Sequence, residues 1–154
     1  MTTTLDVKRV DHLSYTVGDI DRSVNFYAKF GFETVNRYTA AGPELDVAAA
    51  TEHADMDIQL LRRPADGIML ELISYTRHPS DRAARNSEVG AAHLAFVVGD
   101  IQVAYEQLLA DGVQFLSEPN TDKYGEQWVY LRDPDGITVE LMQPNADSAR
   151  AVAQ

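Results

Sequence analysis

The feature that most constrains the fold is an internal repeat. The segment A-H-L-A-F-V-V-G-D-I, residues 92–101, matches D-H-L-S-Y-T-V-G-D-I, residues 11–20, at six of its ten positions. The offset is 81 residues, from 11 to 92. Self-similarity of this kind indicates two copies of one supersecondary unit. One such unit has too little core to be stable alone, so we expect the two copies to pack together.

The first copy predicts the order strand, helix, strand, strand, strand. Asp19 follows the first strand and is placed to cap a helix that Gly31 ends. The turn signal P-A-D-G at 64–67 predicts a hairpin between the last two strands. Residues 39–54 combine turn signals with small residues, which we interpret as a long excursion. The expected strands are 10–17, 32–37, 56–62 and 68–75, and the expected helix is 20–30.

The second copy predicts the same order. Asp100 caps its helix, Gly112 ends that helix, and D-P-D-G supplies the hairpin turn. The hairpins match at an offset of 69, because the first copy carries a longer excursion. That offset makes Asp57, Gln59 and Leu61 equivalent to Glu126, Trp128 and Tyr130. The expected strands are 92–98, 113–116, 127–132 and 137–143.

The length of 154 residues favours one compact domain. We therefore expect residues 1–154 to form a single α+β domain of two modules in tandem, about 8–76 and 91–143. A polar, aperiodic linker at 77–90 would join the modules, and the tail at 144–154 would be frayed.

Composition excludes several classes of function. The chain has no cysteine, which rules out disulfides, thiolate nucleophiles and Cys-ligated metals. A formal net charge of −11 argues against nucleic acid and anionic membranes as partners. The chain has no apolar run long enough to span a membrane, and its N-terminus lacks the apolar core of a signal peptide. We therefore expect a cytoplasmic protein.

The candidate metal ligands are His12, Glu71, His93 and Glu140. Each copy places one histidine in its first strand and one glutamate in its last, on the face opposite the apolar one. A single such residue is usually a hydrogen-bonded or exposed side chain. Four residues of ligand type at equivalent positions of two repeats would converge if the repeats pair about a pseudo-twofold axis. Two imidazoles and two carboxylates suit Zn, Ni, Mn, Co or Fe(II) better than Ca.

The neighbours of these four residues favour a cavity wall over a solvated surface. They mix polar and apolar types, as ligand-binding cavities do. The neighbours expected on the same face are Ser14, Thr16, Met69, Ile73, Ala95, Val97, Thr138 and Met142.

At these residues the chain resembles the vicinal oxygen chelate superfamily, which includes glyoxalase I, methylmalonyl-CoA epimerase, extradiol dioxygenases and the fosfomycin- and bleomycin-resistance proteins. The resemblance rests on the two repeated segments, on I-M-L-E-L-I and on D-P-D-G-I-T-V-E-L. It implies paired βαβββ modules whose curved mixed sheets form a metal-binding cleft. It implies one divalent metal (Ni, Co, Mn, Zn or Fe(II)) held by His12, Glu71, His93 and Glu140, with no organic cofactor.

The ligand pattern separates the members of that superfamily. The His/Glu/His/Glu set resembles glyoxalase I, whereas the epimerase usually has glutamine at the position of Glu71. Extradiol dioxygenases use a three-ligand triad and are about twice this length. Fosfomycin-resistance enzymes also use three ligands, and the antibiotic-binding members hold no metal. Modules in the superfamily pair within one chain or across a dimer. We expect a homodimer, and the sequence leaves the pairing open.

The resemblance implies a metal-dependent isomerase, epimerase or lyase. Such an enzyme moves a proton α to a carbonyl of a small α-hydroxy carbonyl, hemithioacetal or acyl thioester. Glu140 and Glu71 are the candidate bases. Asp57 is a further candidate because it lies near the position of the catalytic glutamate of the epimerase. If Ile58 and Leu60 face the core, Asp57 faces the cleft, on the same side as Glu71. The alternatives are an Fe(II) dioxygenase or thiol transferase of the same fold, and a non-catalytic small-molecule binding or resistance protein.

Five arginines form a basic cluster in this acidic sequence. The cluster could bind a carboxylate or phosphate of the substrate, or it could belong to a solvated linker. Its members are Arg62, Arg63, Arg77, Arg82 and Arg85.

Overall fold

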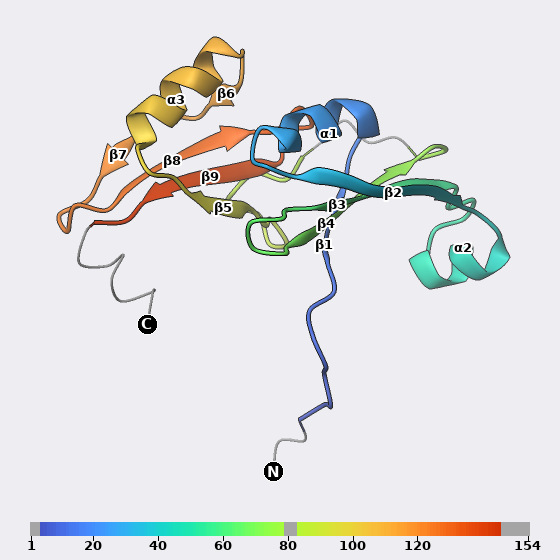
Figure 1. The fold of residues 1–154 in the computed structure, drawn as a ribbon. Coiled ribbons are helices and arrows are strands. Elements are labelled where there is room, and N and C mark those ends of the chain that lie inside the picture. The colour runs from blue at the N-terminus through green and yellow to red at the C-terminus, as the bar shows by residue number, and fades with distance from the viewer. Residues whose placement is uncertain (1–3, 79–82, 146–154) are drawn as a thin grey trace. The chain divides into compact units, whose positions relative to one another are not determined.

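The computed structural model describes residues 4–78 and 83–145. The chain divides into two compact units, residues 1–80 (unit 1) and residues 81–154 (unit 2). Each unit contains one mixed sheet, and a helix follows the first strand of each (Figure 1). The predicted α+β class with mixed sheets is confirmed. Most of the predicted frayed tail, 146–154, lies outside the described residues, as do 79–82 of the predicted linker.

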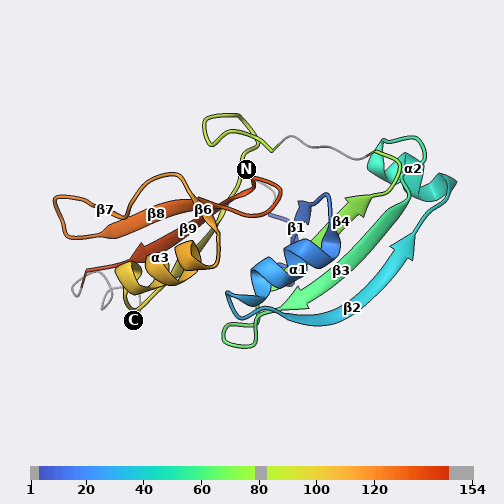
Figure 2. The same cartoon turned by 90° about the horizontal axis from the view of Figure 1, so that it is seen from above.

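Unit 1 is a four-stranded sheet in the order β1-β4-β3-β2 (Figure 2). β1 runs parallel to β4, and the other neighbours are antiparallel. Its elements are β1 (Leu13–Thr16), α1 (Ile20–Ala28), β2 (Glu33–Ala40), α2 (Pro43–Ala49), β3 (Met56–Arg62) and β4 (Met69–Tyr75).

Unit 2 repeats this topology in the order β5-β9-β8-β6, with a short extra strand, β7, also paired to β8. β5 runs parallel to β9, as β1 does to β4. Its elements are β5 (Leu94–Val97), α3 (Ile101–Ala110), β6 (Gln114–Phe115), β7 (Asn120–Thr121), β8 (Gln127–Arg132) and β9 (Thr138–Gln143).

The repeated G-D-I segments set the strand-to-helix turn of each unit. Asp19 and Asp100 are the N-caps of α1 and α3, with nearly identical backbone angles of φ −143°, ψ 110° and φ −144°, ψ 110°. Each carboxylate accepts a hydrogen bond of 3.0 Å from the backbone N–H three residues later, which satisfies one of the free donors of the first turn. Both predicted caps are confirmed.

The apolar strand faces form the core, as predicted. In unit 1, Tyr15, Leu70 and Leu72 are buried on the face that packs against α1, where Tyr15 stacks with the fully buried Tyr27. We call this the helix face. The opposite face, which carries Glu71 in unit 1 and Glu140 in unit 2, we call the pair face. In unit 2, Val139 and Leu141 of β9 are buried in the same way. In the described part of the chain, no helix is long and apolar enough to cross a membrane.

Two elements of the structure, the helix α2 and the strand β7, were not predicted from the sequence. The excursion at 39–54 contains the end of β2 and the helix α2, whose Leu45 packs against Ala54, Met56 and Ile58. A seven-residue helix is too short to show a clear helical period, so the sequence did not reveal it. The two-residue strand β7 was missed for the same reason.

The two hairpins differ by one residue, and this changes the equivalence of the third strands. Residues 63–68 connect β3 to β4, whereas residues 133–137 connect β8 to β9. As a result Leu60 pairs with Glu71, and Tyr130 pairs with Glu140. A shift of one residue moves every side chain of a strand to the other face. The predicted equivalence of Leu61 with Tyr130 is therefore wrong, since Tyr130 corresponds to Leu60.

The glycine of the second hairpin provides a stability test. Gly136 has φ +83°, and a Cβ there would lie 3.2 Å from the Cβ of Ala83. We expect Gly136→Ala to lower the free energy of unfolding by about 1–2 kcal/mol, through left-handed strain and crowding. Urea denaturation would measure the change. Gly99→Ala is the control, because Gly99 has no positive φ and open space around its Cβ position. Equal effects at the two sites would contradict the expectation.

Candidate functional site

In unit 1, the structure brings together His12 and Glu71. His12 lies one residue before β1, not within it as predicted, and Glu71 lies in β4 beside Ser14 of β1. His12 Nε2 is 3.4 Å from Glu71 Oε2. The carboxylate is only 12% exposed and the imidazole 40%. The pair therefore offers one nitrogen and one oxygen donor at a single point on the pair face.

In unit 2, His93 and Glu140 form the same arrangement. His93 lies one residue before β5, and Glu140 lies in β9 beside Ala95. His93 Nε2 is 3.0 Å from Glu140 Oε2, with side-chain exposures of 43% and 12%. The predicted equivalence of the two pairs is thus visible in their positions, their donor atoms and their burial.

The two histidines have different neighbours. His12 Nδ1–H donates to Asp11 Oδ2 at 3.1 Å, and this hydrogen bond, together with Arg9, holds the pKa of Asp11 below its usual range. A carboxylate on one ring nitrogen favours the tautomer whose lone pair is on Nε2. Ala92 stands at the corresponding position in unit 2, where the His93 ring instead packs edge-on against Tyr130, with centroids 5.6 Å apart. Sequence reasoning missed Asp11, although it precedes a candidate ligand.

The donor set fits a divalent metal. Two donors each about 2.1 Å from one ion lie about 3.0–3.4 Å apart at octahedral or tetrahedral angles. The separations in the two pairs, 3.0 Å and 3.4 Å, fall at these values, and the shorter one is also a hydrogen bond between His93 and Glu140. Within either unit, the described residues form no cluster of three or more metal-ligating side chains. Each unit thus supplies two of the four predicted ligands, and their convergence remains a prediction.

A small open pocket of about 160 Å³ adjoins the pair in unit 2. Polar groups hold its wall: Arg132 donates to Thr138 Oγ1 at 2.5 Å, and Thr138 Oγ1 donates to Asn86 Oδ1. This chain of hydrogen bonds ties the segment around Asn86 to β9. No sequence pattern pointed to Asn86, because it lies in the aperiodic linker. The pocket is lined by Asn86, Ala91, Ala92, His93, Tyr130 and Thr138.

Tyr130 contributes the phenol of this pocket. The register of β8 and β9 places Tyr130 directly beside Glu140 on the pair face. Burial raises the pKa of Tyr130, and the charge of Glu140 and a hydrogen bond with its carboxylate raise it further. The hydroxyl therefore stays protonated, and a protonated phenol is a donor for the neighbouring carboxylate.

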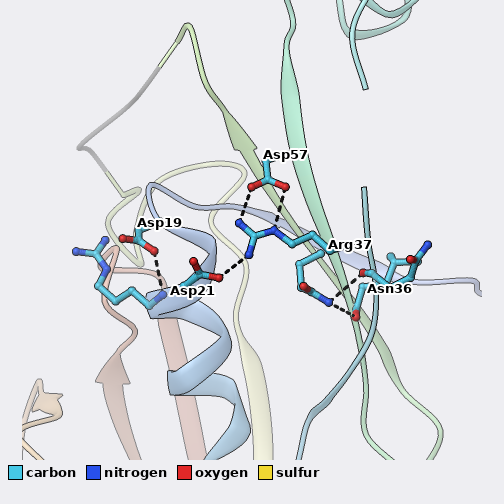
Figure 3. Close-up of polar contacts among 8 residues, drawn as sticks. Asp19, Asp21, Asn36, Arg37 and Asp57 are labelled. Carbon is cyan, nitrogen blue, oxygen red and sulfur yellow. Dashed lines mark hydrogen bonds and ion pairs between the residues drawn. The ribbon is translucent and has the colours of Figure 1, made fainter. Parts of the chain in front are cut away.

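Asp57 does not lie on the pair face. It pairs with Ser74, so it shares the helix face with Gln59 and Leu61, and the prediction that it faces the same side as Glu71 is wrong. The error comes from the assumption that Ile58 and Leu60 face the core, whereas Leu60 pairs with Glu71 and shares its face. Arg37 donates to both oxygens of Asp57, at 3.2 Å and 2.7 Å, and to Asp21 of α1 at 2.5 Å (Figure 3). Asp57 thus links β2 and β3 to α1 through Arg37.

Asp57 provides a test of pH dependence. Its pKa is lowered from 3.8, chiefly by the hydrogen bonds from Arg37. A lowered folded-state pKa contributes stability that is complete above the unfolded pKa and is lost as the pH falls through the folded one. We expect Asp57→Asn to lower the thermal unfolding midpoint at pH 7, with a difference from the wild type that shrinks below about pH 4. Metal binding should be unchanged. Glu33→Gln is the exposed control, and a pH-independent difference would contradict this account.

The predicted basic cluster is divided among local partners. Arg63 pairs with Asp66 and donates to Phe30 O, Arg77 pairs with Asp55, and Arg85 pairs with Glu88. Arg82 lies outside the described residues. Three of the five side chains therefore have carboxylate partners, which favours a structural role over an anion site. Arg62 is exposed and lies on the pair face of unit 1, where it pairs with Met69.

Comparisons with known proteins agree with this architecture. A glyoxalase family protein from Bacillus cereus matches with a TM-score of 0.76 at 20% identity, covering 93% of this chain and 98% of that one. A 2-epi-5-epi-valiolone epimerase from Actinomyces sp. is 38% identical over 149 residues, covering 86% of this chain and 78% of the relative. Lactoylglutathione lyase GLX1 from Arabidopsis thaliana is 26% identical, and the match covers 90% of this chain but only 45% of that protein.

The family assignment rests on nearly the whole chain. The model of the Glyoxalase/Bleomycin resistance protein/Dioxygenase superfamily matches residues 9–141, which include both His–Glu pairs. The chain therefore belongs to the Glyoxalase/Bleomycin resistance protein/Dioxygenase superfamily.

Proposed function

We propose that this protein is a divalent-metal-dependent isomerase or epimerase that moves a proton α to a carbonyl of a small substrate. The observation that carries the proposal is the pair of equivalent His–Glu arrangements, one in each unit. The names of the relatives support it, because epimerisation and lactoylglutathione formation both move a proton next to a carbonyl. A hemithioacetal, an α-hydroxy carbonyl and an acyl thioester remain the candidate substrate classes.

In this proposal His12, His93, Glu71 and Glu140 hold one metal ion, whichever way the modules pair. A bound divalent ion acts as a Lewis acid that polarises the carbonyl and stabilises the oxyanion formed on proton loss. The histidines supply neutral nitrogen donors, and Asp11 orients His12 for this role. The two carboxylates balance the charge of a divalent ion.

The glutamates also move the proton. Glu71 and Glu140 are shielded from water at 12% exposure each, and their oxygens are the acceptors beside the proposed ion. Each unit contributes one carboxylate. One of the two can remove the proton, and the other can return it. This division suits epimerisation, which agrees with the name of the 38%-identical relative.

The experiment combines metal binding with proton exchange. The metal-depleted full chain would be titrated calorimetrically with Ni, Co, Mn and Zn ions. The loaded protein would then be incubated in deuterium oxide with a cyclic polyhydroxy ketone, a hemithioacetal or an acyl thioester. We expect saturable binding of one ion for each set of four ligands. We also expect deuterium to be incorporated α to the carbonyl of at least one compound.

The controls separate the alternatives. His53→Asn removes a histidine that lies outside both pairs at φ +53°, a conformation that asparagine tolerates, and it should bind metal as the wild type does. Failure to bind any divalent ion would overturn the proposal and favour a non-catalytic binding protein. Oxygen uptake with Fe(II) and no proton exchange would identify a dioxygenase instead. Sedimentation analysis would test the proposed homodimer.

A further inference from the structure

The two His–Glu pairs are alike in their own atoms but differ on the neighbouring strand. Glu140 lies beside Tyr130, whereas Glu71 lies beside Leu60. Tyr130 and Leu60 occupy equivalent positions in the two units once the shorter second hairpin is taken into account. Both carboxylates are 12% exposed, so solvent access does not distinguish them. The pairs also differ at Asp11 and Ala92, and Ser14 stands beside Glu71 where Ala95 stands beside Glu140, but only the pair in unit 2 has a phenol beside its carboxylate.

Tyr130 is held by contacts on two sides. Its ring packs edge-on against His93 at 5.6 Å and an interplanar angle of 79°, and the register of β8 and β9 places its phenol beside the Glu140 carboxylate. The half-buried ring also lines the pocket beside the pair. One side chain thus contacts both members of the His93–Glu140 pair.

We propose that Tyr130 is a positioning residue that holds the Glu140 carboxylate against His93, so that the two glutamates of the site are not interchangeable. The inference rests on the proposed function. A donated hydrogen bond restricts rotation of a carboxylate, and such partners orient metal ligands. Leu60 offers Glu71 no donor from the equivalent place. Glu140 therefore keeps one orientation, and Glu71 retains more freedom to change its own.

The test is Tyr130→Phe, which keeps the ring and removes the hydroxyl. We expect the affinity of the full-length protein for Co(II) to fall about 10–100-fold, the usual effect of losing a partner of a metal ligand. The visible absorption spectrum of bound Co(II) should change, because Glu140 no longer holds one orientation. With an exchanging substrate, the rate constant should fall more than KM rises.

The matched control is Tyr105→Phe, in which the ring packs against Phe115 and lies outside both pairs. It should leave Co(II) affinity and spectrum unchanged. Thermal unfolding of both variants would show whether they fold. A Tyr130→Phe protein with wild-type affinity and spectrum would overturn the inference while leaving the proposed function standing. A wild-type protein that binds no Co(II) would overturn both.

Discussion

Replacing Glu140 with glutamine is expected to weaken divalent-metal binding at least about 100-fold, because loss of a ligand should exceed the 10–100-fold cost of losing a partner of a ligand. A neutral amide donates less charge to the ion than a carboxylate does, and the metal-bound site would no longer be neutral. Glu140 is also nearly buried, so water cannot easily take its place. Calorimetric titration of the metal-depleted protein would measure the change, and proton exchange into substrate should be lost in parallel.

The matched control for this variant is Glu118→Gln. Glu118 is exposed in the loop after β6, so the substitution changes the net charge equally without touching either pair. Glu71→Gln should weaken metal binding in the same direction as Glu140→Gln. Retention of wild-type affinity in both Glu71→Gln and Glu140→Gln would remove the glutamates from the ligand set.

The largest effect on stability is expected for Leu72→Ala. Leu72 is fully buried in β4, with Tyr15 of β1 and Gln59 of β3 as its neighbours in register. Removing a buried leucine side chain costs its transfer free energy and leaves a cavity, so the free energy of unfolding should fall by about 2–5 kcal/mol. Urea denaturation followed by circular dichroism would measure the loss.

Val47→Ala on α2 is the control for the Leu72 prediction. Val47 is 82% exposed, so its truncation should change the free energy of unfolding by less than about 0.5 kcal/mol. A loss of similar size at both positions would mean that the helix face of unit 1 is not the core that the strand pattern indicates.

The four candidate ligands were accessible from the sequence because they lie on repeated local patterns. Alternation around His12 and Glu71 placed them on the face opposite the apolar side chains, and the offset of 69 related Glu71 to Glu140. The structure places each histidine beside the glutamate of its own unit. The helix caps at Asp19 and Asp100 were equally clear, because capping depends on a few consecutive residues.

The faces of the third strands could not be read in the same way. Alternation shows which residues share a face, but Ile58 and Leu60 are as apolar as Leu61, so the pattern did not show which face is buried. The assumption that Ile58 and Leu60 face the core then misplaced Asp57. Hydrogen bonding across β3 and β4 resolves this, since it fixes Leu60 beside Glu71.

The sequence by itself determined the repeat, the strand–helix order of each copy and the residue types of both pairs, because these depend on local periodicity and on short turn and cap signals. Only the tertiary structure decided which residues stand beside each glutamate. The unequal hairpins set two different registers, so Tyr130 adjoins Glu140 while Leu60 adjoins Glu71, and Asp57 lies with Arg37 on the helix face. The physical reason is that a strand register depends on pairing between distant segments, where one residue in a turn reverses the direction of every side chain.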